Sequence, residues 1–168
     1  MNLIMKLLLA CSLCVLATPA FSFENEPDSF RGIKWGTDVK DVPKLVKVED
    51  SGSFKAYKKS QDKLKIGEAD VKNVFYGFYD NQFAMVLIEY FGSSSFSLLK
   101  ETLFQLYGTG LRPNRFMENY MWHGKIVDIS MEYSEITKKG SIIYSYKPIG
   151  DKNLKDRKEK AKKGAKDL

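Results

Sequence analysis

The stretch VKNVFYGFYDNQFAMVLIEYFG, residues 71–92, decides the fold of this 168-residue chain. Two runs rich in aromatic and β-branched residues flank the pair Asp80-Asn81. Such residues favour strands, and Asp and Asn tolerate the left-handed backbone that a tight turn needs. The stretch therefore predicts a β-hairpin that turns at Asp80-Asn81.

Pairing within this hairpin predicts which side chains share a face of the sheet. A two-residue turn places Phe78 opposite Phe83 and Tyr76 opposite Met85, whereas a three-residue turn would reverse the two faces. The opposite face carries a Gly beside an Ala, so a helix can pack closely there. The candidate binding residues on the first face are Tyr76, Phe78, Phe83, Met85 and Leu87.

Two interpretations of this aromatic face stay open from the sequence. Exposed apolar patches usually mark contact sites, and aromatic residues are typical anchors of protein interfaces. Alternatively, the face is ordinary core, covered by the N-terminal segment with Phe30, Ile33 and Trp35 or by the loop at Leu111. A binding role for the five candidates requires the first interpretation.

Two helices are predicted, one on each side of the hairpin in sequence. Residues 94–107 carry apolar residues at helical intervals, after serines that can cap a helix and before Gly108 as a stop. The residues of the apolar face are Phe96, Leu99, Leu103, Leu106 and Tyr107. A short helix is predicted over about 38–45, with Thr37 as its cap and Pro43 as its limit.

Further strands are predicted over residues 53–60 and 141–146, and in a hairpin over 118–133 that turns at His123-Gly124. The segment DKLKIG, residues 62–67, forms either a loop or a small additional strand. Hairpins throughout favour an antiparallel sheet with the helices on one side. The predicted fold is α+β, a two-layer sandwich: a mainly antiparallel sheet of about six strands with two helices on one face.

Residues 1–22 have the pattern of a secretory signal peptide: Lys6, an apolar run to Ala17, and small residues before a cut after Ser22. Lipidation at Cys11 is the alternative, although Lys6 interrupts that apolar run. Both cysteines lie in this segment, so the exported part has no disulfide. We expect a periplasmic protein with a single domain over residues 23–150 and no membrane-spanning segment.

The net charge of +6 comes mainly from the C-terminal tail. Of 27 basic and 21 acidic residues, the tail 151–168 holds eight and four, and the signal holds one Lys and no acid. The domain between them is left with 18 basic and 17 acidic residues, so it is a poor candidate for nucleic-acid binding. We expect residues 151–168 to be a basic, disordered extension that contacts anionic surfaces weakly, or else a solubilising end or a fraying helix.

Few catalytic constellations are possible in the exported part. It has no Cys and a single His, His123, which excludes a Cys-His pair and a multi-His zinc site. No phosphate loop, dinucleotide fingerprint or calcium loop is present, so no cofactor is expected. The enzymatic alternative is a small hydrolase that uses the carboxylates of Glu89, Asp128 or Glu132.

The motif FRGIKWGT at residues 30–37, with VFYGFYDNQFAMVLIEY, LYGTGLRPN and YMWHGKIVDISMEY, resembles a family of small exported proteobacterial proteins. The likeness spans most of residues 30–147; it implies an envelope location and no catalytic residues. The order of elements is loosely similar to the SmpA/OmlA-type outer-membrane assembly lipoproteins and to the β-lactamase-inhibitor-like fold, which work by protein contact. The hypothesis is therefore a non-enzymatic protein-binding or envelope-assembly module whose partner is another envelope protein.

Overall fold

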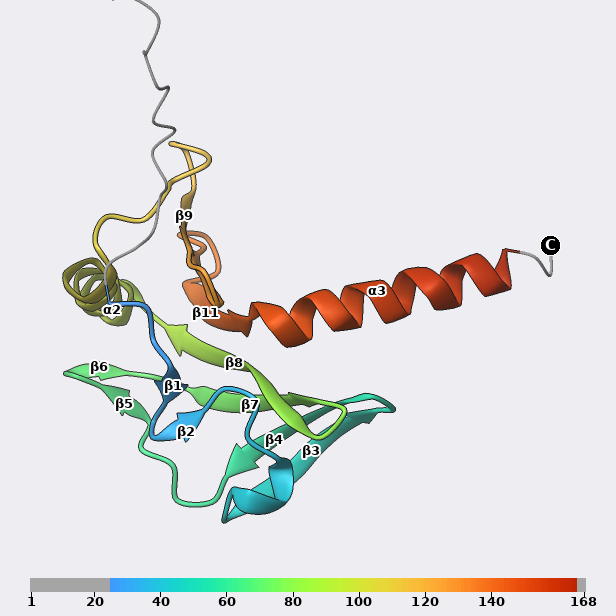
Figure 1. Ribbon diagram of the computed structural model, residues 1–168. Helices are drawn as coiled ribbons and strands as arrows, with labels where there is room; N and C mark the ends of the chain where they lie inside the picture. The colour runs from blue at the N-terminus through green and yellow to red at the C-terminus, as the bar shows by residue number, and fades with distance from the viewer. Residues whose placement is uncertain (1–24, 166–168) are drawn as a thin grey trace, which may run out of the picture.

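A computed structural model describes residues 25–165, in which one large antiparallel sheet lies between two α-helices (Figure 1). The predicted signal peptide and the last three residues lie outside the described residues. Along the chain the strands are β1 (Ser29–Phe30), β2 (Ile33–Lys34), β3 (Leu45–Ser51), β4 (Phe54–Lys59), β5 (Lys65–Ile66), β6 (Ala69–Asp70), β7 (Asn73–Tyr79), β8 (Gln82–Phe91), β9 (Glu118–His123), β10 (Val127–Tyr133) and β11 (Lys139–Tyr146). The helices are η1 (Val39–Asp41, a 3-10 turn), α2 (Ser93–Tyr107) and α3 (Lys147–Gly164).

The large sheet has the strand order β3-β4-β7-β8-β11-β10-β9, and every neighbouring pair is antiparallel. The predicted α+β class and antiparallel sheet are confirmed, with seven strands in this sheet where about six were expected. The strand that the prediction missed is β3, an edge strand whose side chains are all exposed except that of Leu45, so it lacks the buried apolar residues that indicate a strand. The segment 62–67 does include a small strand, β5, which pairs with β6.

The central hairpin forms as predicted, with its turn at Asp80-Asn81. Both turn residues have positive φ, 47° and 64°, as a tight hairpin turn requires. Next to the turn Phe78 lies opposite Phe83, but one step further on Gly77 lies opposite Met85. Ala84 is therefore an extra residue in β8, a β-bulge that simple alternation could not predict.

This bulge changes the face of every side chain beyond it in β8. Tyr76 lies opposite Val86 rather than Met85, so Met85 and Leu87 point to the other side of the sheet. The prediction that the five candidate residues share one face is therefore wrong. Tyr76, Phe78 and Phe83 lie on one face, and Met85 and Leu87 lie on the opposite face.

The face that carries Tyr76, Phe78 and Phe83 is the main hydrophobic core, which α2 and the N-terminal segment cover. At most 1% of each of these three side chains is exposed, so the prediction that they face solvent is also wrong. The ring of Trp35 stacks on that of Phe83 with centroids 4.8 Å apart, and Phe30 lies edge-on to Tyr76 at 6.0 Å. The second interpretation, cover by the N-terminal segment, is the one that the structure bears out.

The N-terminal segment reaches this position through a sharp turn at Gly36, whose φ is 82°. Trp35 packs on the sheet as expected, and its Nε1 donates a hydrogen bond to the backbone oxygen of Pro27 at 2.9 Å. The helix predicted over 38–45 is no more than the 3-10 turn η1, because Pro43 has no N–H to continue it. Its cap is Asp38, which accepts a hydrogen bond from the backbone of Lys40, and not Thr37.

The two α-helices lie on opposite faces of the sheet: α2 is the helix predicted over residues 94–107, whereas α3 was not one of the two predicted helices. Helix α2 presents buried residues to the main core, although Leu106, expected on that face, is 45% exposed. Helix α3 contacts the other face, where Ile149 packs with Tyr79 and Ala84. The prediction of a disordered tail from residue 151 is wrong for residues 151–164, which continue α3 away from the sheet (Figure 1).

Candidate functional site

The candidate site is the sheet face opposite α2, called the open face here. Its side chains form three rows that cross β7, β8, β11, β10 and β9. The polar row is Asn73, Glu89, Ser141, Glu132 and Asn119; the apolar row is Phe75, Leu87, Ile143, Ser130 and Met121; the third row is Gly77, Met85, Ser145, Asp128 and His123. Helix α3 covers the end of this face next to the third row.

The apolar row is built from side chains that are half-buried rather than covered. Phe75, Leu87 and Ile143 lie side by side on three successive strands, and Met121 follows beyond Ser130. The ammonium group of Lys58 lies 4.8 Å from the centre of the Phe75 ring and limits the row at the β4 side. Phe75, Leu87 and Ile143 thus form an apolar band across β7, β8 and β11, and Ser130 separates it from Met121.

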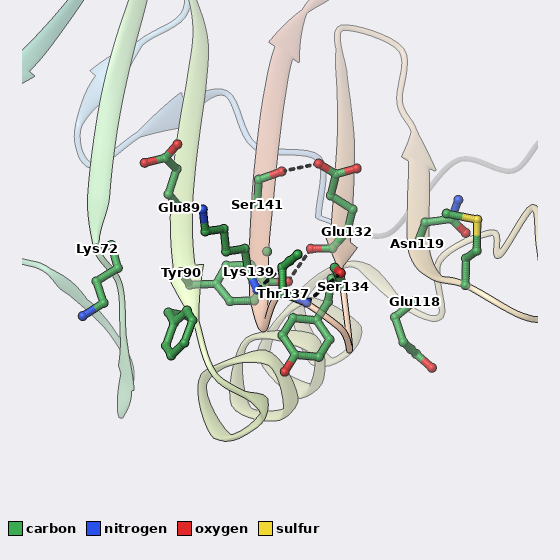
Figure 2. Close-up of a pocket in the computed structure, with 14 residues that line it drawn as sticks. Lys72, Glu89, Tyr90, Glu118, Asn119, Glu132, Ser134, Thr137, Lys139 and Ser141 are labelled. Atoms are coloured by element: carbon green, nitrogen blue, oxygen red, sulfur yellow. Dashed lines mark hydrogen bonds between the residues drawn. The ribbon is translucent and has the colours of Figure 1, made fainter.

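A pocket of about 560 Å³ adjoins the polar row, at the end of the sheet where β8 and β10 end and β9 and β11 begin. Figure 2 shows Glu89, Ser141, Glu132 and Asn119 on successive strands across this pocket. Its rim includes two large apolar side chains that are more than half exposed, Phe91 and Met117. The pocket therefore combines hydrogen-bonding groups with apolar walls, as ligand sites commonly do.

The carboxylates of the polar row are held by their neighbours. Asn73 donates a hydrogen bond to Glu89 Oε2 at 2.7 Å and accepts one from Lys58 Nζ at 2.7 Å. Ser141 Oγ donates to Glu132 Oε1 at 3.0 Å, the contact drawn in Figure 2. Each carboxylate keeps its second oxygen without a hydrogen bond from a described residue, so both can accept one from a ligand.

Asn119 and Tyr133, which also line this pocket, each have a buried polar atom without a hydrogen-bond partner among the described residues: Asn119 Oδ1 and Tyr133 Oη. Such atoms are uncommon in folded proteins, because a buried polar group without a partner costs free energy.

The wall between pocket and core depends on close packing at Gly140. A side chain at Gly140 would overlap the ring of Tyr90, which lies on the neighbouring strand. The hydroxyl of Tyr90 donates to the backbone oxygen of Glu132 at 2.7 Å, and burial raises the pKa of this phenol far above its usual value. This hydrogen bond connects β8 to β10 across β11 and stabilises the pocket end of the sheet.

The structure separates the three carboxylates of the hydrolase alternative. Glu89 and Glu132 line the pocket on either side of Ser141, but Asp128 lies two rows away. There Asp128 Oδ1 is 3.3 Å from His123 Nδ1 and 3.7 Å from Lys147 Nζ. Of the three acids, two line the pocket, and Asp128 lies beside His123 and Lys147 in the third row.

Two of the five candidate binding residues, Met85 and Leu87, lie on the open face and are half-buried. The pocket residues Ser141 and Asn119 were not anticipated from the sequence. Polar residues at alternate positions of β9 and β11 were the available signal, but placing them opposite Glu132 required the strand register. No group of three His, Cys, Asp or Glu side chains among residues 25–165 is arranged to hold a metal ion.

Comparisons with known proteins leave the site to be interpreted from its own geometry, since no family model, curated protein or solved structure matched the chain. Within residues 25–165 no helix combines the length and the hydrophobicity that crossing a membrane requires.

Proposed function

We propose that this chain is a non-enzymatic protein-binding module of the cell envelope and that its binding surface is the open face. The observation that carries the proposal is the apolar row, in which Phe75, Leu87 and Ile143 lie together and partly exposed on adjacent strands. No described element covers this row, whereas the main hydrophobic core lies on the other face of the sheet. Apolar bands of this kind typically serve as the centre of an interface.

The pocket beside the apolar row supports a polypeptide with a cationic side chain as the partner. Glu89 and Glu132 each offer there a carboxylate oxygen that accepts no hydrogen bond from a described residue. A Lys or Arg side chain donates several hydrogen bonds and carries the complementary charge. In the proposed complex, apolar side chains of the partner contact Leu87 and Ile143 while a basic side chain enters the pocket.

An envelope location rests on the signal-peptide pattern of residues 1–22 and on the resemblance of the FRGIKWGT motif to exported proteins. Both are predictions from the sequence. They direct the search for a partner to the periplasm and its membranes.

The binding surface is tested by replacing Leu87 and Ile143 by serine, each alone, and comparing capture of partners from cross-linked envelope extracts. The matched control is Ile136→Ser, because Ile136 is 94% exposed in the loop between β10 and β11, outside the rows of the open face. We expect one defined protein to co-purify in a fixed ratio with the wild type and with Ile136→Ser. Its loss from both open-face variants, with unfolding midpoints near the wild-type value, supports the proposal; equal capture by all four proteins contradicts it.

A hydrolase that uses Glu89 and Glu132 is the second candidate, because these two acids line one pocket. Neighbouring antiparallel strands lie about 4.8 Å apart, so two residues separated by one strand are about 10 Å apart at the backbone. Inverting glycosidases place their carboxyl groups at about 6.5–9.5 Å. Turnover of chromogenic glycosides that Glu89→Gln and Glu132→Gln both abolish would favour this candidate over the binding module.

A further inference from the structure

Helix α3 is fixed to the sheet at its beginning and then leaves it. Ile149 is buried against Tyr79 and Ala84, and Lys152 Nζ forms an ion pair with Asp80 at 2.7 Å. Tyr79 Oη donates a hydrogen bond to Asp156 at 2.8 Å. Figure 1 shows the rest of the helix extending away from the body without a neighbouring element.

The extending part of α3 carries Lys and Arg side chains that form no ion pair with a described residue. Each of the following side chains is exposed and has no acidic partner among the described residues: Lys155, Arg157, Lys158, Lys162 and Lys163. By contrast, the two cations nearer the start of the helix contact acids of the body, Lys147 with Asp128 and Lys152 with Asp80. The unpaired cations therefore begin where the helix leaves the sheet.

Three of these cations form one stripe along the helix. Lys155, Lys158 and Lys162 follow one another at intervals of three and four residues, which places them on the same side. Leu154 lies in this stripe and is 51% exposed, and Asp151 and Glu159 lie on the same side of the helix, so three cations face two acids there. The stripe presents positive charge and one apolar side chain outward.

We propose that α3 is a basic arm that binds the phosphate headgroups of an anionic lipid surface. Its cations are mainly lysines, whose compact ammonium groups bind phosphates as point charges. The described part of α3 carries no aromatic residue that could stack on bases, which is the usual basis of single-strand nucleic-acid binding. Since the domain before the arm is nearly neutral, attraction to the surface would come from the arm.

The contacts at the start of α3 give this arm a defined direction. Because Ile149 and the Lys152–Asp80 pair fix the helix to the end of the open face, a bound arm also sets the orientation of that face relative to the lipid surface. A disordered tail with the same charge would bind but would not orient the domain.

The test is co-sedimentation of the purified protein with vesicles of phosphatidylcholine, with and without phosphatidylglycerol. The arm variant combines Lys155→Gln, Lys158→Gln and Lys162→Gln. Its control makes the same change in net charge at exposed, unpaired lysines of the body, and combines Lys34→Gln, Lys44→Gln and Lys63→Gln. Circular dichroism before sedimentation checks that all three proteins are equally folded.

Each cation near an anionic surface contributes about fivefold to partitioning, so the arm variant should bind phosphatidylglycerol vesicles at least tenfold more weakly than the wild type. The control should stay within about twofold, and wild-type binding should fall steeply as salt is added. Equal losses in both variants, no wild-type binding to phosphatidylglycerol vesicles, or tighter binding to a single-stranded oligonucleotide at the same salt would each overturn the proposal.

Discussion

Replacing Phe83 by alanine measures how much the packed aromatic face contributes to stability. The side chain of Phe83 is completely buried, and its ring centroid lies 4.8 Å from that of Trp35 and 5.4 Å from that of Phe78. Truncating a buried Phe costs about 3–5 kcal/mol, and stacked aromatic pairs add to the area term. We expect the free energy of unfolding to fall by about 4 kcal/mol, a large share of the total for a domain of this size.

The assay for this prediction is urea unfolding, followed in parallel by far-UV circular dichroism and by tryptophan fluorescence. Leu87→Ala is the matched comparison, because Leu87 is on the same strand but half-buried on the open face. It should cost only about 1–2 kcal/mol, since less apolar area returns to water. A cost below about 1 kcal/mol for Phe83→Ala, or equal costs for the two variants, would refute the assignment of faces.

Two further predictions concern the packing of β11 and the N-terminal segment. Gly140→Ala should lower the free energy of unfolding by about 1–3 kcal/mol, because the added methyl group overlaps the buried ring of Tyr90. Gly150→Ala in α3 is the control and should be neutral or stabilising by up to about 1 kcal/mol. Chemical denaturation of both variants measures the difference. Burial raises the pKa of Glu26, but hydrogen bonds from the backbone N–H groups of Val127 and Ile126 outweigh it, so the pKa is lowered from 4.5 overall. The Glu26 carboxylate therefore stabilises the fold above about pH 4.5, and this stabilisation is lost as the pH falls through the folded-state pKa. Between pH 6 and pH 3 the thermal unfolding midpoint should therefore fall less for Glu26→Gln than for the wild type.

Much of the fold could be predicted from local sequence patterns. The turn at Asp80-Asn81 was predictable because few residue pairs accept positive φ at both positions. Helix α2 was predictable because Phe96, Leu99 and Leu103 recur at helical spacing. These features depend on neighbours in sequence, and the structure confirms both.

The faces of the sheet could not be predicted, because one bulge at Ala84 decides them. Met85, Val86, Leu87 and Ile88 are all apolar, so their order does not indicate which pair is buried. Without the bulge Tyr76 would lie opposite Met85, and with it Tyr76 lies opposite Val86. The extra residue brings Phe83 and Val86 to the same face although they are three positions apart.

The C-terminal helix was anticipated only as an alternative to a disordered tail, for a related reason. Its composition, rich in Lys and poor in apolar residues, is typical of a solvated segment. The few residues that attach it to the sheet are spread over two turns, with Ile149 and Lys152 facing partners about seventy residues earlier in the chain. Such long-range contacts are not visible in a local pattern.

The most direct test of the account is the reactivity of single cysteines at two adjacent positions of β8. In a chain with Cys11 and Cys14 replaced by serine, Val86→Cys and Leu87→Cys are labelled with a thiol reagent under native conditions. Val86 is completely buried in the main core and Leu87 lies on the open face, so position 87 should react readily and position 86 only after unfolding. Rapid labelling at position 86 together with protection at position 87 would mean that the exposed and buried faces are the reverse of those described.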